Sequence, residues 1–329
     1  MRLSLADAEA LVGAALERVG TAPAAARSVA AALVNAEAAG QSGHGLRRVV
    51  IYAAQVSAGK VDGRAGPSFE RIAPGVLRID AHYGFAYPAL DLAVGELPAL
   101  VREQGVAVAA IRRSHHAGVL GLTVERFAQV GLVALMVANA PAAMAPWGGR
   151  LPLFGTNPLA FAAPVAHGDP VVVDLSLSKV ARGKVMAARQ KGVPIPEGWA
   201  FDRDGNPTTD PDAAIAGTMA PMGDAKGAAL ALMVEMLAAG VTGAQFGFEA
   251  DSLLDAEGSA PALGHLILAL DPERIGGPGA VERLAAMAAA VAAQEGARIP
   301  GRRGQELRRQ AETQGIDIED DVLATIRGL

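Results

Sequence analysis

The chain has 329 residues and a formal net charge of −5, with 51% hydrophobic and 19% charged residues. This composition is typical of a soluble globular protein with a large core and more than one domain, and it argues against a nucleic-acid partner, which would favour a basic surface. The chain contains no cysteine, which excludes disulfides, thiolate nucleophiles and cysteine metal ligands and is compatible with a reducing cytoplasm.

The first part of the chain predicts helices. Ser4 is able to cap a helix over residues 4–19, in which Leu11, Ala15 and Leu16 share one face. An alanine-rich helix is expected over 22–39, and a third helix from about 46 to 57.

No segment has the pattern of a signal peptide or a membrane span. Asp7 and Glu9 interrupt the N-terminal segment, and the apolar stretch 227–241 contains Glu235 and is too short to cross a bilayer. We therefore expect a cytoplasmic protein without a membrane partner.

From about residue 68 the pattern changes to short β-rich runs separated by helices. The runs are VLRIDA, VAVAAIR, VALMVANA, LAFAAPV, PVVVDLS and GHLILALDP, each bounded by turn residues. Helices are expected over 87–104, 118–130, 226–241 and 279–295, and turns over 181–212. A basic loop, a charged helix and a short terminal helix complete the chain, which predicts a mixed α/β fold.

The two common nucleotide-binding motifs are absent. The segment HAGVLGL holds Gly118 and Gly121 but lacks the first glycine of a G-x-G-x-x-G fingerprint, and no Walker loop occurs. A nucleotide, if one binds, is held by a binding site of a different type from these two motifs.

Two adjacent histidines, His115 and His116, follow the strand VAVAAIR and precede a helix. Histidine titrates near neutral pH and is suited to proton transfer, and strand-to-helix turns often carry functional groups. Packing of a histidine at the helix N-terminus is the alternative interpretation.

A second candidate is the segment SGHGLRR. His44 lies between two glycines at the start of a helix, and Arg48 is placed to hold a carboxylate through two hydrogen bonds. A solvated basic turn is the alternative.

Three further segments, 145–161, 174–184 and 221–235, are too specific for unconstrained loops. In the last of them Lys226 precedes an apolar helix, where the helix dipole disfavours a cation. This placement indicates an anionic ligand group nearby, with simple solvent exposure as the alternative.

Together these segments resemble the type-2 malate/L-lactate dehydrogenase family of NAD(P)-dependent oxidoreductases. GTNPLAFAAP, ARGK, PIPEGWAFDRDGNPTTDP and PMGDAKG occur in order, and the resemblance extends from GHGLRR to RIPGRR. It implies a non-Rossmann cofactor-binding domain with a largely antiparallel sheet, helical domains and a homodimer. The expected division is a helical domain of 1–65 with 280–329, a sheet domain of 66–215 with 245–279, and a helical insertion of 216–244.

The resemblance also implies site residues. The catalytic histidine corresponds to His116, and His44 matches the family's Ser-His-Gly motif, although many members have serine where this chain has Gly43, with Ser42 adjacent. The implied substrate-binding residues are Arg48, Thr156, Arg182 and Gly183, with Asn157 beside them in the GTNP turn. The implied cofactor-binding residues are His116, Ala117, Gly118, Val119, Leu120, Asp174, Leu175, Ser176, Lys226, Gly301, Arg302 and Arg303.

The implied reaction is hydride transfer between nicotinamide and C2 of a small 2-hydroxy or 2-oxo acid, of the malate, lactate or sulfolactate type. Arg302 and Arg303 are able to hold a 2′-phosphate, which favours NADP slightly over NAD. Reduction of the cyclic imines Δ1-piperideine-2-carboxylate and Δ1-pyrroline-2-carboxylate is the alternative. A non-catalytic ligand-binding protein, or a metal hydrolase using His44, His115 and His116, represents a different class. No metal is expected, because the metal-binding motif H-E-x-x-H is absent.

Overall fold

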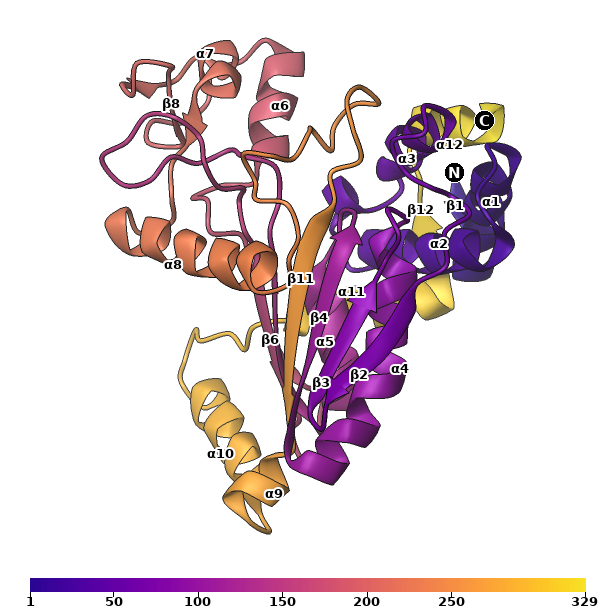
Figure 1. Cartoon of the computed structure of the whole chain (residues 1–329), viewed down its shortest axis with the longest axis vertical. Coiled ribbons are helices and arrows are strands. Elements are labelled where there is room, and N and C mark those ends of the chain that lie inside the picture. The colour runs from indigo at the N-terminus through magenta and orange to yellow at the C-terminus, as the bar shows by residue number, and fades with distance from the viewer.

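A seven-stranded mixed sheet organises the computed structural model, which describes residues 1–329 (Figure 1). The strand order is β2-β3-β4-β11-β5-β6-β7, and every neighbouring pair is antiparallel except β3 with β4. This confirms the expected mixed α/β fold with a largely antiparallel, non-Rossmann sheet. The strands are β2 (Ser68–Ala73), β3 (Val76–Asp80), β4 (Val106–Ser114), β5 (Val133–Ala138), β6 (Leu159–Ala163), β7 (Val171–Leu175) and β11 (Leu263–Leu270).

Helices α4 (Ala86–Gln104) and α5 (Leu120–Gln129) pack against this sheet. The buried residues of α4 recur at spacings of three and four, which gives the helix one apolar face toward β4. The helix ends at Gly105, whose φ of 83° is readily adopted only by glycine. The helix α5 packs on β5, β6 and β7, and this arrangement places the β4–α5 turn at one end of the sheet.

Helices from both ends of the chain pack together. Contacts join α1 with α2, α3 and α12, and α2 with α11, while the two-residue strands β1 and β12 pair with each other (Figure 1). Ser4 accepts a hydrogen bond from the amide of Asp7, as predicted for the first cap. These elements are β1 (Arg2–Leu3), α1 (Leu5–Arg18), α2 (Pro23–Ala38), α3 (Arg48–Ser57), α11 (Arg302–Gln314), β12 (Ile316–Asp317) and α12 (Asp320–Gly328).

A second, smaller core lies against strands β5 and β6 of the sheet. It gathers Val137, Phe154, Val185, Met219 and Val234 with other apolar side chains. Its elements are α6 (Arg182–Lys191), β8 (Ala200–Phe201), β9 (Pro207–Thr208), α7 (Pro211–Ala216), β10 (Thr218–Met219) and α8 (Ala225–Glu235), which continues into a π-helical turn (Met236–Gly240). The remaining helices are α9 (Pro272–Gly276) and α10 (Ala280–Ala292), which contact each other. The predicted division of the chain into three domains stays a prediction.

The segment 181–212, for which the sequence indicated turns, also contains regular elements. This segment holds α6 and the start of α7, besides two short strands. Only Val185 of α6 is buried, so the helix shows no apolar periodicity, and it forms from residues of high helix propensity. The strand β2 is exposed along its whole length and for that reason shows no alternation either.

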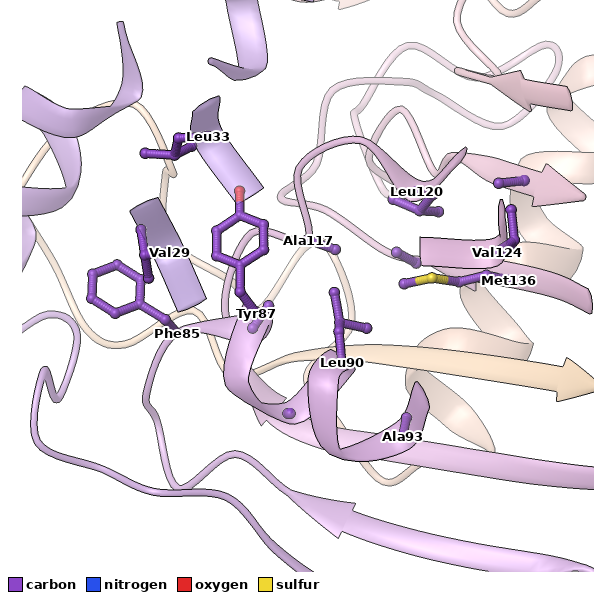
Figure 2. Close-up of a cluster of buried hydrophobic side chains, with 14 of the residues drawn as sticks. Val29, Leu33, Phe85, Tyr87, Leu90, Ala93, Ala117, Leu120, Val124 and Met136 are labelled. Carbon is purple, nitrogen blue, oxygen red and sulfur yellow. The ribbon is translucent and has the colours of Figure 1, made fainter. Parts of the chain in front are cut away.

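The largest core joins the terminal helices to the sheet. Figure 2 shows Val29 and Leu33 of α2 beside Phe85 and Tyr87 at the start of α4. The same cluster continues through Ala117 and Leu120 of the β4–α5 turn to Met136 of β5. The turn with the two histidines therefore rests on a continuous apolar base. None of the helices combines the length and apolarity that crossing a membrane requires.

Candidate active site

The two adjacent histidines of the β4–α5 turn have different surroundings. His115 is buried at 1% exposure, with its ring edge-on to Tyr52 and Phe85, and neither of its ring nitrogens has a hydrogen-bond partner. Burial, with the charges of Arg48 and Lys60, lowers the pKa of His115 to about 3. His115 is therefore a neutral packing residue, and His116 is the histidine that remains for chemistry.

His116 is held on one side by a pair of tyrosines. Its Nδ1 lies 2.7 Å from the Tyr52 hydroxyl, which in turn lies 3.2 Å from the Tyr87 hydroxyl. Because Nδ1 is occupied, Nε2 is the nitrogen left for a ligand. Burial and the nearby charge of Arg48 lower the pKa of His116 well below its ordinary value, so its imidazole is neutral at neutral pH.

His44 stacks on His116. Their ring centroids are 5.2 Å apart and the planes differ by 19°. His44 ends a 3-10 turn (Ser42–His44) between α2 and α3, and burial followed by the charge of Arg48 lowers its pKa to about 4. The structure thus brings together His44 and His116, the two catalytic candidates from distant parts of the sequence.

Arg48 begins α3 with most of its guanidinium unengaged. Its Nε donates to the carbonyl oxygen of Gly43 at 2.8 Å, which orients the side chain, and it forms no ion pair. Arg47, by contrast, pairs with Glu319. A partly exposed arginine that lacks a carboxylate partner and influences two neutral histidines is suited to bind an anionic group.

Three of the predicted cofactor segments meet around the start of α5. The amide of Gly121 donates to Asp174 Oδ2 at 2.7 Å, which joins the β4–α5 turn to the end of β7. A Cβ at Gly301 would lie 2.8 Å from the Cβ of Val172, so the start of α11 packs directly on β7. A Cβ at Gly118 would lie 2.6 Å from the Tyr87 hydroxyl, and this residue has a φ of 66°. Glycine is thus required at Gly118 for two reasons.

The cationic side chains of these segments differ in whether a carboxylate already pairs with them. Arg302 donates to Asp169 Oδ2 at 2.6 Å, and Arg309 donates to the same oxygen. The side chains of Arg303 and Lys226 are exposed and have no hydrogen-bond or ion-pair partner. Arg303 is therefore the arginine of the pair that is free to meet a phosphate.

The remaining candidate residues make fewer contacts with the histidines. The Thr156 carbonyl accepts from the amide of Leu177 at 2.8 Å, and Ser176 and Ser178 share a hydrogen bond of 2.7 Å. Arg182 is half-buried at the start of α6 and reaches only the carbonyl of Ile215, at 3.4 Å. No hydrogen bond or ion pair joins Arg182, Gly183, Leu175 or Lys226 to the histidines.

Asn157 has a different role from the one expected for the GTNP turn. Its Nδ2 donates to Glu235 Oε2 at 2.7 Å, and Glu235 Oε1 accepts from Asn139 at 3.0 Å and from the amide of Gly247 at 2.7 Å. All three side chains are buried. Asn157 therefore ties the turn to α8 rather than lining the site.

Sequence reasoning missed Tyr52 and Tyr87. The chain contains only three tyrosines, and Tyr52 lies one helical turn after Arg48 on the same face of α3. That spacing was a usable signal, whereas the contact of Tyr87 depends on tertiary packing. No group of three or more histidine, aspartate or glutamate side chains is arranged to hold a metal ion.

Comparison with known proteins extends along the whole chain. The family model described as malate/L-lactate dehydrogenase matches residues 3–327. The (2R)-3-sulfolactate dehydrogenase (NADP(+)) of Chromohalobacter salexigens is 52% identical over 325 residues, covering 99% of this chain and 97% of the relative. The Δ1-pyrroline-2-carboxylate/Δ1-piperideine-2-carboxylate reductase of Pseudomonas putida is 39% identical and covers 100% of this chain and 97% of its own.

Solved structures have the same fold. Δ1-piperideine-2-carboxylate reductase from Pseudomonas syringae superposes with a TM-score of 0.94 at 38% identity, over 100% of this chain and 99% of that one. Sulfolactate dehydrogenase from Methanocaldococcus jannaschii superposes with a TM-score of 0.89 at 28% identity, over 100% and 96%.

Proposed function

The chain belongs to the malate/L-lactate dehydrogenase family, and from this premise we propose that it is an NADP-dependent dehydrogenase of a small 2-hydroxy acid of the 3-sulfolactate type. It is an NAD(P)-dependent oxidoreductase, as the named dehydrogenases and reductases of its family are. The observation that carries the choice of substrate is the 52% identity with the sulfolactate dehydrogenase over nearly the full length of both chains, against 39% with an imine reductase.

The residues fit a nicotinamide cofactor. Glycine at positions 118 and 301 lets the β4–α5 turn pack against Tyr87 and the start of α11 pack against β7, which brings these cofactor-binding candidates together, and Arg303 supplies an uncommitted cation. We assign Gly118, Asp174 and Arg303 to cofactor binding, with Arg303 facing the 2′-phosphate that distinguishes NADP. When bound, the cofactor supplies or accepts the hydride at C2 of the substrate.

Arg48 and His116 act on different parts of the substrate. Arg48 binds the carboxylate through its free guanidinium nitrogens, which fixes the position of C2. His116 Nε2 gives a proton to the oxygen on C2 during reduction and removes it during oxidation. His44 and Tyr52 keep the imidazole in position through the stack and the Nδ1 hydrogen bond.

Substrate binding changes the basicity of His116. The charge of Arg48 is one cause of the lowered pKa, after burial. A carboxylate bound to Arg48 offsets this charge and raises the pKa of His116 toward the pH at which the enzyme works. The imidazole then takes up the proton that reduction requires.

Reduction of the cyclic imines Δ1-piperideine-2-carboxylate and Δ1-pyrroline-2-carboxylate is the second candidate. It is favoured by the structural similarity to the reductase from Pseudomonas syringae, with its TM-score of 0.94. A protonated imine needs less assistance from a relay hydroxyl, and this chain has Gly43 at the position of the family's serine. Arg48 would hold the same carboxylate in both reactions.

We propose a homodimer in the cytoplasm as the working form. Exposed apolar side chains on α8, on the π-helical turn that follows it and on α10 support an interface between copies, since exposed apolar patches mark interaction surfaces. They include Leu230, Met233, Met236 and Met287, of which Met287 is 67% exposed. The lack of cysteine is compatible with a reducing compartment. Light scattering during gel filtration measures the number of copies directly.

A substrate panel tests the proposed function. Oxidation of NADPH and of NADH is followed with 3-sulfopyruvate, oxaloacetate, pyruvate and the two cyclic imines. The proposal expects the highest kcat/KM for 3-sulfopyruvate with NADPH. Turnover of the imines alone would support the second candidate instead, and turnover of none would contradict both.

A further inference from the structure

Lys60 is fully buried although it carries a charge. Its side chain is 0% exposed, and Nζ donates to the carbonyl oxygens of Asp255, at 3.4 Å, and Glu257, and to Asp255 Oδ1 at 3.3 Å. Lysine is almost never fully buried unless its ammonium group finds such partners. All of its acceptors belong to one loop, so this loop and Lys60 depend on each other.

The loop spans residues 246–261 between α8 and β11. Its ends are joined by a hydrogen bond of 3.1 Å from the amide of Gln245 to the carbonyl of Ala262. Inside the loop Asp255 Oδ1 accepts from the amide of Glu257 at 3.1 Å, and Asp251 Oδ2 accepts from the amide of Ser259 at 2.6 Å. This is a compact Ω-type loop that retains its own shape.

The 246–261 loop is held in two places, at its base beside the turn that carries Thr156 and at its far end by α3. At its base the amide of Gly247 donates to Glu235, which also holds Asn157, the neighbour of Thr156. At its far end the Gln55 side chain donates to the carbonyl of Asp255 at 2.8 Å. In Figure 1 the loop extends away from the sheet to the side on which α3 lies.

The far anchor lies on the functional face of α3. Arg48, Tyr52 and Gln55 are spaced by four and three residues, so their side chains leave the helix on one face. Lys60 is fixed to the same helix end, because its amide donates to the carbonyl of Gln55 at 2.9 Å. The loop therefore contacts the helix that carries Arg48 within two turns of that residue.

We propose that Lys60 is a positioning residue: by holding the 246–261 loop against α3, it sets the separation between Arg48 and the turn at Thr156 and thereby the fit of the substrate. The inference rests on the proposed function, in which Arg48 binds the substrate carboxylate. Lys60 itself touches neither the substrate nor the cofactor in this account.

The test compares Lys60→Met with Lys191→Met, a matched control at an exposed lysine in the last turn of α6. Hydrogen exchange of peptides covering 251–259 reports whether the loop is held, and steady-state kinetics report the KM for the acid and for NADPH separately. Lys60→Met should accelerate exchange at least about tenfold and raise the KM for the acid by about tenfold, since it removes hydrogen bonds to a charged donor. The KM for NADPH and both readouts of the control should stay within about twofold.

A folded Lys60→Met protein with unchanged exchange, or with faster exchange and an unchanged KM for the acid, would overturn the proposal. If this variant does not fold, Gln55→Leu removes one anchor only, and it should change both readouts in the same direction to a smaller extent; a Gln55→Leu protein with neither change would also overturn it. If the wild-type enzyme reduces no 2-oxo acid, the proposed function fails, and KM is measured with a cyclic imine carboxylate. Hydrogen exchange needs no substrate, so it shows in every case whether Lys60 holds the 246–261 loop.

Discussion

The hydroxyl of Tyr52 lies 2.7 Å from Nδ1 of His116, so a buried residue of α3 fixes the imidazole that follows β4. Which ring nitrogen of a histidine acts on a ligand is determined by the hydrogen bond that the other nitrogen makes. The Tyr52–His116 contact therefore directs Nε2 toward the substrate, and the 3.2 Å contact of Tyr52 with Tyr87 steadies the hydroxyl.

Tyr52→Phe removes this hydroxyl and leaves the ring in place. We expect kcat to fall by about 10- to 100-fold while the substrate KM changes less, because the imidazole loses its orientation but Arg48 is intact. Tyr83→Phe, at a 43% exposed position, is the control and should leave kcat unchanged. A kcat within about twofold of wild type for Tyr52→Phe would contradict the assigned role.

His116→Ala should lower kcat by about 10²- to 10⁴-fold, the usual contribution of a general acid–base group. The matched control is His82→Ala, since His82 has a 44% exposed side chain on a different loop. Steady-state rates in both directions check this. Near-normal turnover by His116→Ala would require another proton donor and would refute the mechanism.

Arg48→Gln tests the electrostatic link between the two residues. The charge of Arg48 helps to lower the pKa of His116, so its removal should raise that pKa. Oxidation requires neutral His116, and its kcat/KM declines as pH falls through the pKa of the free enzyme. The acid limb of this profile should move to higher pH in Arg48→Gln, with a higher KM for the acid. An acid limb at the same pH in wild type and variant would show that the charge of Arg48 does not influence the pKa of His116.

Arg303→Ala should raise the KM for NADPH by about tenfold or more and change that for NADH little, because only NADP carries the 2′-phosphate. Arg302→Ala is the comparison, since Arg302 is already engaged by Asp169 at 2.6 Å. Its effect on the preference between the two cofactors should be smaller. Equal losses with both cofactors in Arg303→Ala would refute the assignment of the phosphate site.

Buried neutral histidines make stability depend on pH. Burial is the main cause that lowers the pKa of His115 to about 3 and those of His44 and His265 to about 4. The unfolded chain binds protons near pH 6.5, where the folded chain does not, so the free energy of unfolding falls as pH decreases below about 6.5. Between pH 7 and 5, His115 alone accounts for about 2 kcal/mol.

His115→Leu tests the size of this contribution. Urea denaturation at both pH values should show a loss that is smaller by about 2 kcal/mol in the variant than in the wild type. The substitution suits the apolar surroundings of Tyr52 and Phe85. Equal losses in the two proteins would indicate that His115 does not titrate on unfolding.

Much of the fold and part of the candidate site could be predicted from the sequence. The runs around β4 and β11 have clear apolar patterns, and the strand-to-helix turn at His115 and His116 follows from them. The polar helix α6 and the exposed strand β2 lack such patterns, because neither has a buried face that would impose a period.

The contacts that distinguish the two histidines depend on tertiary packing. Periodicity does not reveal that the Tyr52 hydroxyl reaches His116, or that Asn157 turns away to meet Glu235 across 78 positions of sequence. Likewise the two arginines of the PGRR segment look equivalent in sequence, whereas Asp169 pairs with Arg302 and leaves Arg303 free.

The proposed function requires direct hydride transfer from the nicotinamide to C2 of a 2-oxo acid, and isotope transfer follows this hydride. NADPH with deuterium at both hydrogen positions of nicotinamide C4 is incubated with 3-sulfopyruvate, and the product is examined by NMR and mass spectrometry. Direct transfer gives 3-sulfolactate with deuterium at C2. Unlabelled 3-sulfolactate, or no reduction of 3-sulfopyruvate by an enzyme that reduces the cyclic imines, would contradict it.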